Sequence, residues 1–190
     1  GQTPPDLGAV VARHYQPLIT RLTQCRVPTI CALNGVAAGA GASLALVCDM
    51  LVASESASFM LPFAKIGLIP DTACSWIVTQ RIGMARSLGL AMTGQKLSAA
   101  QAKEWGLIWA TAPADRFMAE AMALAQQMAD LPTQPLVRTR ELMLGSHTHT
   151  MGQQMEAEAR AMTELGRSAD YVEGVAAFLD KRPAQFNRKA

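Results

Sequence analysis

The 190-residue sequence has few aromatic side chains, no long apolar run and no cluster of basic residues. Phe, Trp and Tyr make up 5% of the chain although 50% is hydrophobic, so the core must consist largely of aliphatic side chains and methionine. No apolar run is long enough to cross a bilayer, and we expect a cytoplasmic protein without membrane contact. With 17 Lys and Arg against 15 Asp and Glu, and no basic run, we expect no nucleic-acid partner.

The sequence also has no motif for disulfides, metals or a serine nucleophile. Its four cysteines lack CxxC spacing, which predicts buried thiols in a reducing compartment; they are Cys25, Cys31, Cys48 and Cys74. The three histidines are scattered, and two of them, His147 and His149, lie in a polar stretch typical of an exposed loop, so we expect no metal site. Ser43 and Ser75 lie outside any GxSxG motif, which disfavours nucleophilic serine chemistry.

Residues 28–49 form the clearest local pattern in the chain. The run TICAL at 29–33 is typical of a buried strand, and an apolar helix is expected from about Gly41. Gly39 and Gly41 flank Ala40, and small residues there let a ligand approach the free N–H groups of the first helical turn. Such a helix start can stabilise phosphate or a carbonyl oxyanion. The absence of GxxxxGK[ST] and GxGxxG spacing disfavours phosphate, and close helix packing remains the structural alternative.

The rest of the sequence predicts further short strands, followed by helices alone. Asp6 is expected to cap a helix that ends near Arg26 and is divided at Pro17. Strands are predicted at 50–54, 57–61 and 107–111, an irregular segment at 62–70, and helices at 75–82 and 98–106.

From Asp115 onward every pattern is helical. The last two helices are predicted at 151–165 and 170–181, the second with Asp170 and Glu173 at capping-box spacing. The expected domains are a core at 1–131 and a helical C-terminal region at 132–190.

Asp71 is the best candidate for acid–base chemistry. It follows Ile69 and Pro70 directly, and a carboxylate among apolar neighbours should be poorly solvated, which suits a general base that takes a proton from carbon. The alternative is that Asp71 caps the helix that follows it, which is a common role for aspartate.

Three segments together resemble the crotonase, or enoyl-CoA hydratase/isomerase, superfamily: PTICALNGVAAGAGASLAL, SASFMLPFAKIGLIPD and SADYVEGVAAFLDKRPAQF. KIGLIPD, LSAAQAKEWGLIW and GRSADYVEGVAAFLDKR are most similar to the branch that isomerises ring-1,2-epoxyphenylacetyl-CoA in phenylacetate catabolism. The resemblance implies an α/β fold, a crotonase-like spiral of ββα units with a C-terminal helical trimerisation region, and a homotrimer or dimer of trimers. It also implies an acyl-CoA thioester substrate, with coenzyme A as part of that substrate and no separate cofactor.

The resemblance also implies roles for individual residues. The N–H of Ala40, given room by Gly39 and Gly41, matches the second donor of an oxyanion hole. The first donor is expected upstream of Gly1, so this polypeptide alone should be poorly active. Asp71 matches the acid–base aspartate of the isomerases. The other implied substrate-binding residues are Phe63, Ile69, Pro70, Phe178 and Lys181.

Two departures from the family pattern bear on the reaction. Ser43 and Phe63 stand where the hydratases have two glutamates, which disfavours water addition. Ala73 and Cys74 stand where the family usually has glycines, and they strain the loop if φ is positive there or stabilise it if the backbone is helical. We expect an acyl-CoA isomerase, with an enoyl-CoA hydratase or a non-catalytic acyl-CoA-binding relative as alternatives.

Overall fold

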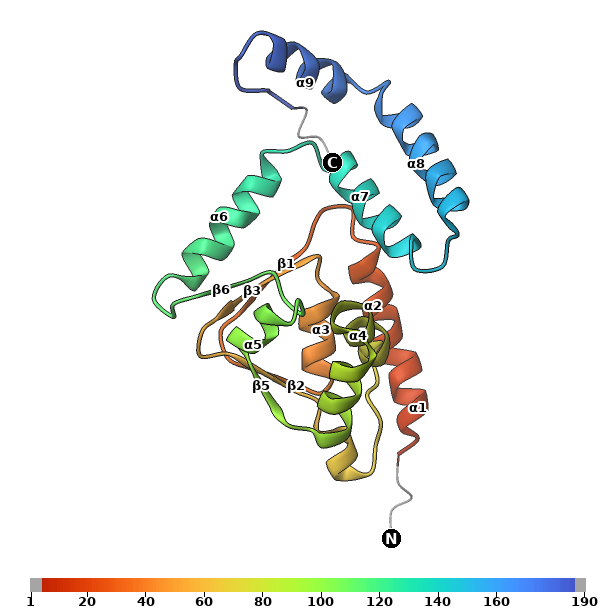
Figure 1. Ribbon diagram of the computed structural model, residues 1–190, viewed down its shortest axis with the longest axis vertical. Helices are drawn as coiled ribbons and strands as arrows, with labels where there is room; N and C mark the ends of the chain where they lie inside the picture. The colour runs from red at the N-terminus through yellow and green to blue at the C-terminus, as the bar shows by residue number, and fades with distance from the viewer. Residues whose placement is uncertain (1–4, 187–190) are drawn as a thin grey trace. The chain divides into compact units, whose positions relative to one another are not determined.

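The computed structural model describes residues 5–186, which divide into two compact units. Within the described residues, the first unit contains 5–25 and 29–123, and the second contains 26–28 and 124–186. Figure 1 follows the chain from red at the N-terminus to blue at the C-terminus. The division at 123/124 falls inside helix α6 (Phe117–Ala129), whereas the predicted boundary at 131/132 falls after it and stays a prediction.

The N-terminal segment forms a helix with an internal irregularity. α1 (Leu7–Val10) leads through a π-helical turn (Val11–Tyr15) into α2 (Gln16–Thr23). The Asp6 carboxylate accepts the Ala9 N–H at 3.0 Å, which confirms the predicted cap. Pro17 lies in the first turn of α2, where its missing N–H is tolerated. The expected kink or split near Pro17 takes the form of the π-helical turn just before it, and the backbone stays helical through that turn.

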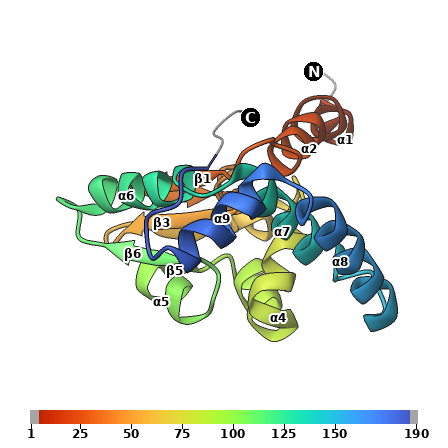
Figure 2. The same ribbon diagram turned by 90° about the horizontal axis from the view of Figure 1, so that it is seen from above.

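Two three-stranded sheets organise the first unit (Figures 1 and 2). One has the strand order β1-β3-β6 and is parallel throughout; the other has the order β2-β4-β5, with β2 and β4 parallel and β5 antiparallel. The strands are β1 (Ile30–Leu33), β2 (Val36–Ala38), β3 (Met50–Ser54), β4 (Ser58–Met60), β5 (Lys96–Ser98) and β6 (Ala110–Ala112). β2 and β5 were not expected from sequence, because three residues are too few to show a strand period.

Each tight turn between consecutive strands carries the chain from one sheet to the other. Asn34 and Gly35 join β1 to β2, and Glu55 and Ser56 join β3 to β4. A helix follows each pair: α3 (Ala40–Val47) after the first, and a 3₁₀ turn (Pro62–Ile66) and α4 (Cys74–Thr93) after the second. This succession confirms the expected ββα units.

A polar contact closes the first of these units. The Asp49 carboxylate accepts the Thr29 N–H at 2.8 Å and the Thr29 hydroxyl at 3.2 Å, while the Asp49 N–H donates to that hydroxyl at 3.0 Å. Thr29 precedes β1 and Asp49 precedes β3, so this contact fixes the start of the parallel pair.

The helices differ from expectation at several ends. α4 comprises two helices joined across a kink at Gly83 (φ 75°, ψ 168°), so its first helix ends at the predicted residue 82. α5 (Ala99–Glu104) has the predicted capping box of Ser98 and Gln101. The remaining helices are α7 (Thr133–Gly145), α8 (Met151–Leu165) and α9 (Ala169–Leu179).

α9 is capped by a residue other than the predicted one. The Ser168 hydroxyl accepts the Tyr171 N–H at 3.1 Å, so the prediction of a cap at Asp170 is wrong. Glu173, the other half of the predicted box, pairs with Arg182 instead.

The core is aliphatic, as the composition predicts, but none of the 11 methionines is buried, so the expected contribution of methionine is wrong. The largest fully buried side chains are Phe59 and the leucines at 46, 51, 61, 90, 97 and 107. Among the four cysteines only Cys74 is buried and the others are half-buried, so the expectation of buried thiols holds for one of them. Within residues 5–186, no helix has the length and hydropathy to cross a membrane, and no three His, Cys, Asp or Glu side chains are placed to hold a metal ion.

Candidate functional site

The start of α3 presents backbone donors that the helix itself does not use. Ala40 is the first helical residue, and Gly39 before it has φ 55° and ψ −129°, a conformation that glycine adopts readily. The Gly39 carbonyl accepts the N–H groups of Ala42 at 3.0 Å and Ser43 at 3.3 Å. The N–H groups of Ala40 and Gly41 precede these first intrahelical bonds and are therefore available to a ligand.

The surroundings of this helix start are apolar beside Gly39 and open beside Gly41. A Cβ atom placed on Gly39 would lie 3.6 Å from Cζ of Phe63, whose side chain is 8% exposed. A Cβ placed on Gly41 would have no heavy-atom neighbour within 4 Å. The Gly39 N–H donates to the Met60 carbonyl at 3.0 Å and so fixes the turn to the end of β4.

Asp71 lies beside this helix start because its backbone is bonded to α3. Its carbonyl accepts the Ser43 hydroxyl at 3.3 Å and the Cys74 N–H at 2.9 Å, and the Ser43 side chain is completely buried. Ser43 is three residues after Ala40, on the same helical face and about 4.5 Å further along the axis. The main chain of Asp71 is therefore bonded to the first turn of α3, the turn that begins at Ala40.

The Asp71 side chain does not cap the helix that follows. The N-cap of α4 is Ala73, which makes no side-chain capping bond, while Oδ1 of Asp71 accepts the Thr72 hydroxyl at 3.0 Å. The capping alternative is wrong, because the tight turn places two further residues between Asp71 and the helix. Asp71 and Pro70 are half-buried, but Ile69 is 79% exposed, so Ile69 does not desolvate the carboxylate within this chain.

The turn between Asp71 and α4 is strained at two residues. Thr72 has φ 55° and Ala73 has φ 63°, and a left-handed conformation costs roughly 1–2 kcal/mol for a residue other than glycine. Cys74, in contrast, is the first residue of α4. Of the two departures from the family pattern, Ala73 is therefore strained and Cys74 is helical. Thr72 was not identified from the sequence. The available signal was a tight turn that contains no glycine.

Cys74 contributes packing rather than a nucleophile. Burial is the main cause that raises the pKa of its thiol. The Ser43 hydroxyl lowers that pKa by less than burial raises it, and the Asp71 charge is the smallest cause and raises it. A thiol with a raised pKa stays protonated near neutral pH and is a weak nucleophile.

The other two predicted substrate-binding residues belong to the second unit. Phe178 is 82% exposed on α9, and Lys181 follows the helix with φ 51°. Ala40 and Asp71 belong to the first unit, and the roles of Phe178 and Lys181 stay predictions.

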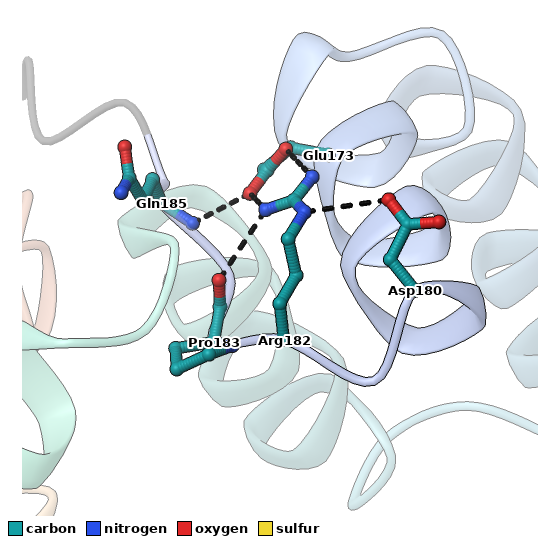
Figure 3. A network of polar contacts seen from close by, with 5 residues as sticks. All are labelled: Glu173, Asp180, Arg182, Pro183 and Gln185. Carbon is teal, nitrogen blue, oxygen red and sulfur yellow. Dashed lines mark hydrogen bonds and ion pairs between the residues drawn. The ribbon is translucent and has the colours of Figure 1, made fainter.

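The ion pair near these residues uses Arg182, not Lys181 (Figure 3). Arg182 binds the Glu173 carboxylate through two nitrogens at 2.7 and 2.9 Å, and the Gln185 N–H donates to the same carboxylate at 2.7 Å. The Arg182 guanidinium and then the Gln185 N–H lower the pKa of Glu173 to about 2. This network folds the segment after α9 back onto the helix.

Paired short strands that alternate between two sheets, each pair followed by a helix, define the class of crotonase-fold proteins. Solved structures of that class superpose closely on this chain. An enoyl-CoA hydratase from Bacillus anthracis has a TM-score of 0.93 at 26% identity, over 100% of this chain and 73% of that chain. One from Polaromonas sp. JS666 has a TM-score of 0.91 at 32% identity, over 96% and 71%.

Sequence comparison identifies the family within that class. The model for enoyl-CoA hydratase/isomerase matches residues 2–189. The chain is 46% identical over 185 residues to 1,2-epoxyphenylacetyl-CoA isomerase of Escherichia coli K12, covering 97% of this chain and 71% of the relative. It is 39% identical over 181 residues to a probable enoyl-CoA hydratase of Rhodobacter capsulatus, covering 95% and 70%. The protein belongs to the enoyl-CoA hydratase/isomerase family.

Proposed function

We propose that the protein is an acyl-CoA isomerase that works through a thioester enolate, with ring-1,2-epoxyphenylacetyl-CoA as its substrate. The observation that carries the proposal is the hydrogen bond from the Ser43 hydroxyl on α3 to the Asp71 main-chain carbonyl, which supports a position of Asp71 near the start of that helix. The 46% identity to a 1,2-epoxyphenylacetyl-CoA isomerase supports the choice of substrate.

In the proposed reaction the thioester carbonyl oxygen accepts a hydrogen bond from the Ala40 N–H. Asp71 takes a proton from the carbon next to the thioester, and the electron pair of that C–H bond enters the enolate. The backbone donor stabilises the resulting oxyanion, and loss of such a donor costs about 3 kcal/mol in the transition state. Asp71 then returns the proton at another carbon; with the ring epoxide as substrate, the strained ring opens to an oxepin.

The side chains around the site favour isomerisation over water addition. Phe63 and Ser43 are both buried and neither is acidic, so neither can serve as a second carboxylate that activates water. An apolar ring beside Gly39 instead offers a surface to an apolar acyl group. The chemistry requires coenzyme A only as part of the substrate.

A hydratase is the second candidate, because a relative at 39% identity is named a probable enoyl-CoA hydratase. The two activities separate on two substrates tested with the full-length protein. Isomerisation of the epoxide thioester without hydration of crotonyl-CoA supports the proposal. Hydration of crotonyl-CoA as the main activity would replace the isomerase proposal with a hydratase. Binding of acyl-CoA without turnover would indicate a non-catalytic relative.

The residue that tests the mechanism is Asp71. Asp71→Asn keeps the size of the side chain but removes the base, and kcat should fall roughly 10²- to 10⁴-fold. Asp115→Asn, at an exposed position before α6, is the matched control and should retain kcat. Unchanged turnover in Asp71→Asn would remove this carboxylate from the mechanism.

The proposed assembly is a homotrimer or a dimer of trimers, in which Phe178 and Lys181 help bind coenzyme A across a subunit boundary. The exposure of Phe178 supports this arrangement, since a partner or ligand would cover it. Light scattering after size exclusion gives the mass of the assembly. A monomer that retains full activity and the same KM in Phe178→Ala would contradict the arrangement.

A further inference from the structure

Thr72 has a backbone conformation that its residue type disfavours. Its φ is 55°, and a positive φ is a genuine outlier for a β-branched residue. Glycine would adopt this conformation without strain. Outliers of this kind persist where the surrounding structure holds them, and they concentrate at functional sites. The Thr72 side chain must therefore provide something that glycine could not.

What the side chain provides is a hydroxyl group next to the proposed base. Oγ1 of Thr72 lies 3.0 Å from Oδ1 of Asp71, and Thr72 is 5% exposed. An ionised carboxylate only accepts hydrogen bonds, so the hydroxyl is the donor. Burial limits competition from water and strengthens the bond.

The Asp71 main chain is fixed by separate contacts. Its carbonyl is bound by the Cys74 N–H from α4 and by the Ser43 hydroxyl from α3. The Thr72 bond adds the one restraint that acts on the carboxylate itself, at Oδ1. The other oxygen, Oδ2, is then the atom to which a substrate proton can be transferred.

We propose that Thr72 is a positioning residue whose hydroxyl holds Oδ1 of Asp71 and so directs Oδ2 to the substrate carbon. This inference rests on the proposed role of Asp71 as the base. When the C–H bond breaks, its electron pair enters the thioester enolate and the proton goes to Oδ2. Oδ1 keeps its acceptor lone pairs, so the Thr72 bond persists through the step. Return of the proton to another carbon restores the carboxylate, and no further reactant is needed.

Three variants of the full-length protein separate the hydroxyl from the backbone. Thr72→Val keeps the shape without the hydroxyl, and kcat should fall about 10- to 100-fold with little change in KM. Thr72→Ser keeps the hydroxyl and should retain most of kcat. Thr72→Gly relieves the backbone but lacks the hydroxyl, so its kcat should fall as in Thr72→Val. If Thr72 served only to shape the turn, Thr72→Gly would keep its kcat.

The split between kcat and KM, with rescue by the conservative variant, gives a readout that a purely structural role would not change. Thr72→Ser keeps the hydroxyl and should rescue kcat, whereas Thr72→Val and Thr72→Gly lack it and should lower kcat at nearly unchanged KM.

Two controls distinguish failure of this inference from failure of the proposed function. Ala73→Gly changes the neighbouring left-handed residue, which is exposed, and should keep kcat. Normal turnover in Asp71→Asn would overturn the proposed function. Loss of turnover in Asp71→Asn, together with normal kcat in Thr72→Val and Thr72→Gly, would overturn the role of Thr72 alone.

Discussion

The two units of the chain bury their side chains to very different extents. The first unit contains two sheets and nearly all the buried residues, including Ser43 and Thr72 at the site. Among the described residues of the second unit, Ala177 alone is buried. Large apolar side chains are exposed there instead: Met151, Met155, Met162, Val172, Phe178 and Leu179. The candidate site thus belongs to the unit that has its own core.

The second unit has exposed ion pairs where the first has packing. Arg138 forms ion pairs with Glu141 on α7 and with Glu164 on α8, each at 2.8 Å. Arg182, which follows α9, forms an ion pair with Glu173 on α9. Exposed pairs contribute little stability unless several charges act together. Changes in the first unit should therefore alter stability and catalysis, and changes in the second should alter assembly and the response to pH.

The largest expected effect tests the difference in packing. Leu46 is 1% exposed on α3 and Leu179 is 71% exposed on α9. Leu46→Ala should lower the free energy of unfolding by about 2–5 kcal/mol, because it leaves a cavity. Leu179→Ala should change it by less than about 0.5 kcal/mol. Denaturant titrations measure both. Equal losses of unfolding free energy in the two variants would mean that Leu179 is buried in an assembly. The difference in burial between the two units would then hold for the isolated chain only.

The next effect tests the open space at the start of α3. Gly41 is the second residue of α3, and a leucine there would occupy the space above the donors while raising helix propensity by about 1 kcal/mol. Gly41→Leu should stay folded and lose kcat/KM by about 100-fold or more. Gly152 is the matched control, because it is the second residue of α8 and also has no neighbour within 4 Å. Equal activity in Gly41→Leu and Gly152→Leu would remove the helix start from the site.

A smaller effect compares backbone strain in the two units. Ala73 and Lys181 are both exposed, and both have a positive φ. Glycine at either position should raise the free energy of unfolding by up to about 1 kcal/mol, because the left-handed penalty disappears. Thermal unfolding of Ala73→Gly and Lys181→Gly measures the gain. Destabilisation by Ala73→Gly alone would show that the methyl group matters more than the strain.

The smallest effect is the pH dependence of the segment after α9. The pKa of Glu173 falls from an ordinary 4.5 to about 2 in the folded chain. Between these values the unfolded chain binds more protons, so the stabilisation is fully present above pH 4.5 and is lost as the pH falls toward 2. Glu173→Gln should remove this dependence. Amide exchange of α9 at stepped pH measures it, and Glu158→Gln on α8 is an exposed control. An unchanged pH dependence in Glu173→Gln would assign the loss to another group.

Local patterns predicted the parts of the site that depend on residue type. The small residues around Ala40 and the apolar segment before Asp71 were visible, and the family resemblance joined them. The Ser43–Asp71 bond could not be predicted, because it links residues 28 positions apart through their packing. The capping and catalytic interpretations of Asp71 could not be separated either, because both use the same residue type ahead of a helix.

The fold was predicted where an element was long or carried a specific capping signal. β1, β3 and the α5 capping box followed from sequence, whereas β2 and β5 required the partner strand β4 to be recognised. The positive φ of Thr72 and Ala73 was not predictable, because glycine is the residue that normally marks a positive φ in a tight turn and neither residue is glycine. Ser168 was overlooked as a cap since Asp170 offered the same spacing two residues later.

The Thr29–Asp49 contact gives the first ββα unit a particular place in folding. It joins residues 20 positions apart and encloses β1, β2 and α3, so the donor half of the site is a local structure with a low loop-closure cost. The donor half is completed by the Gly39–Met60 bond to β4, and the Asp71 half needs the 3₁₀ turn in addition. We expect pulsed hydrogen exchange to protect the amides of α3 before those of the first turn of α4. Simultaneous protection would show that the two halves of the site form as one cooperative unit.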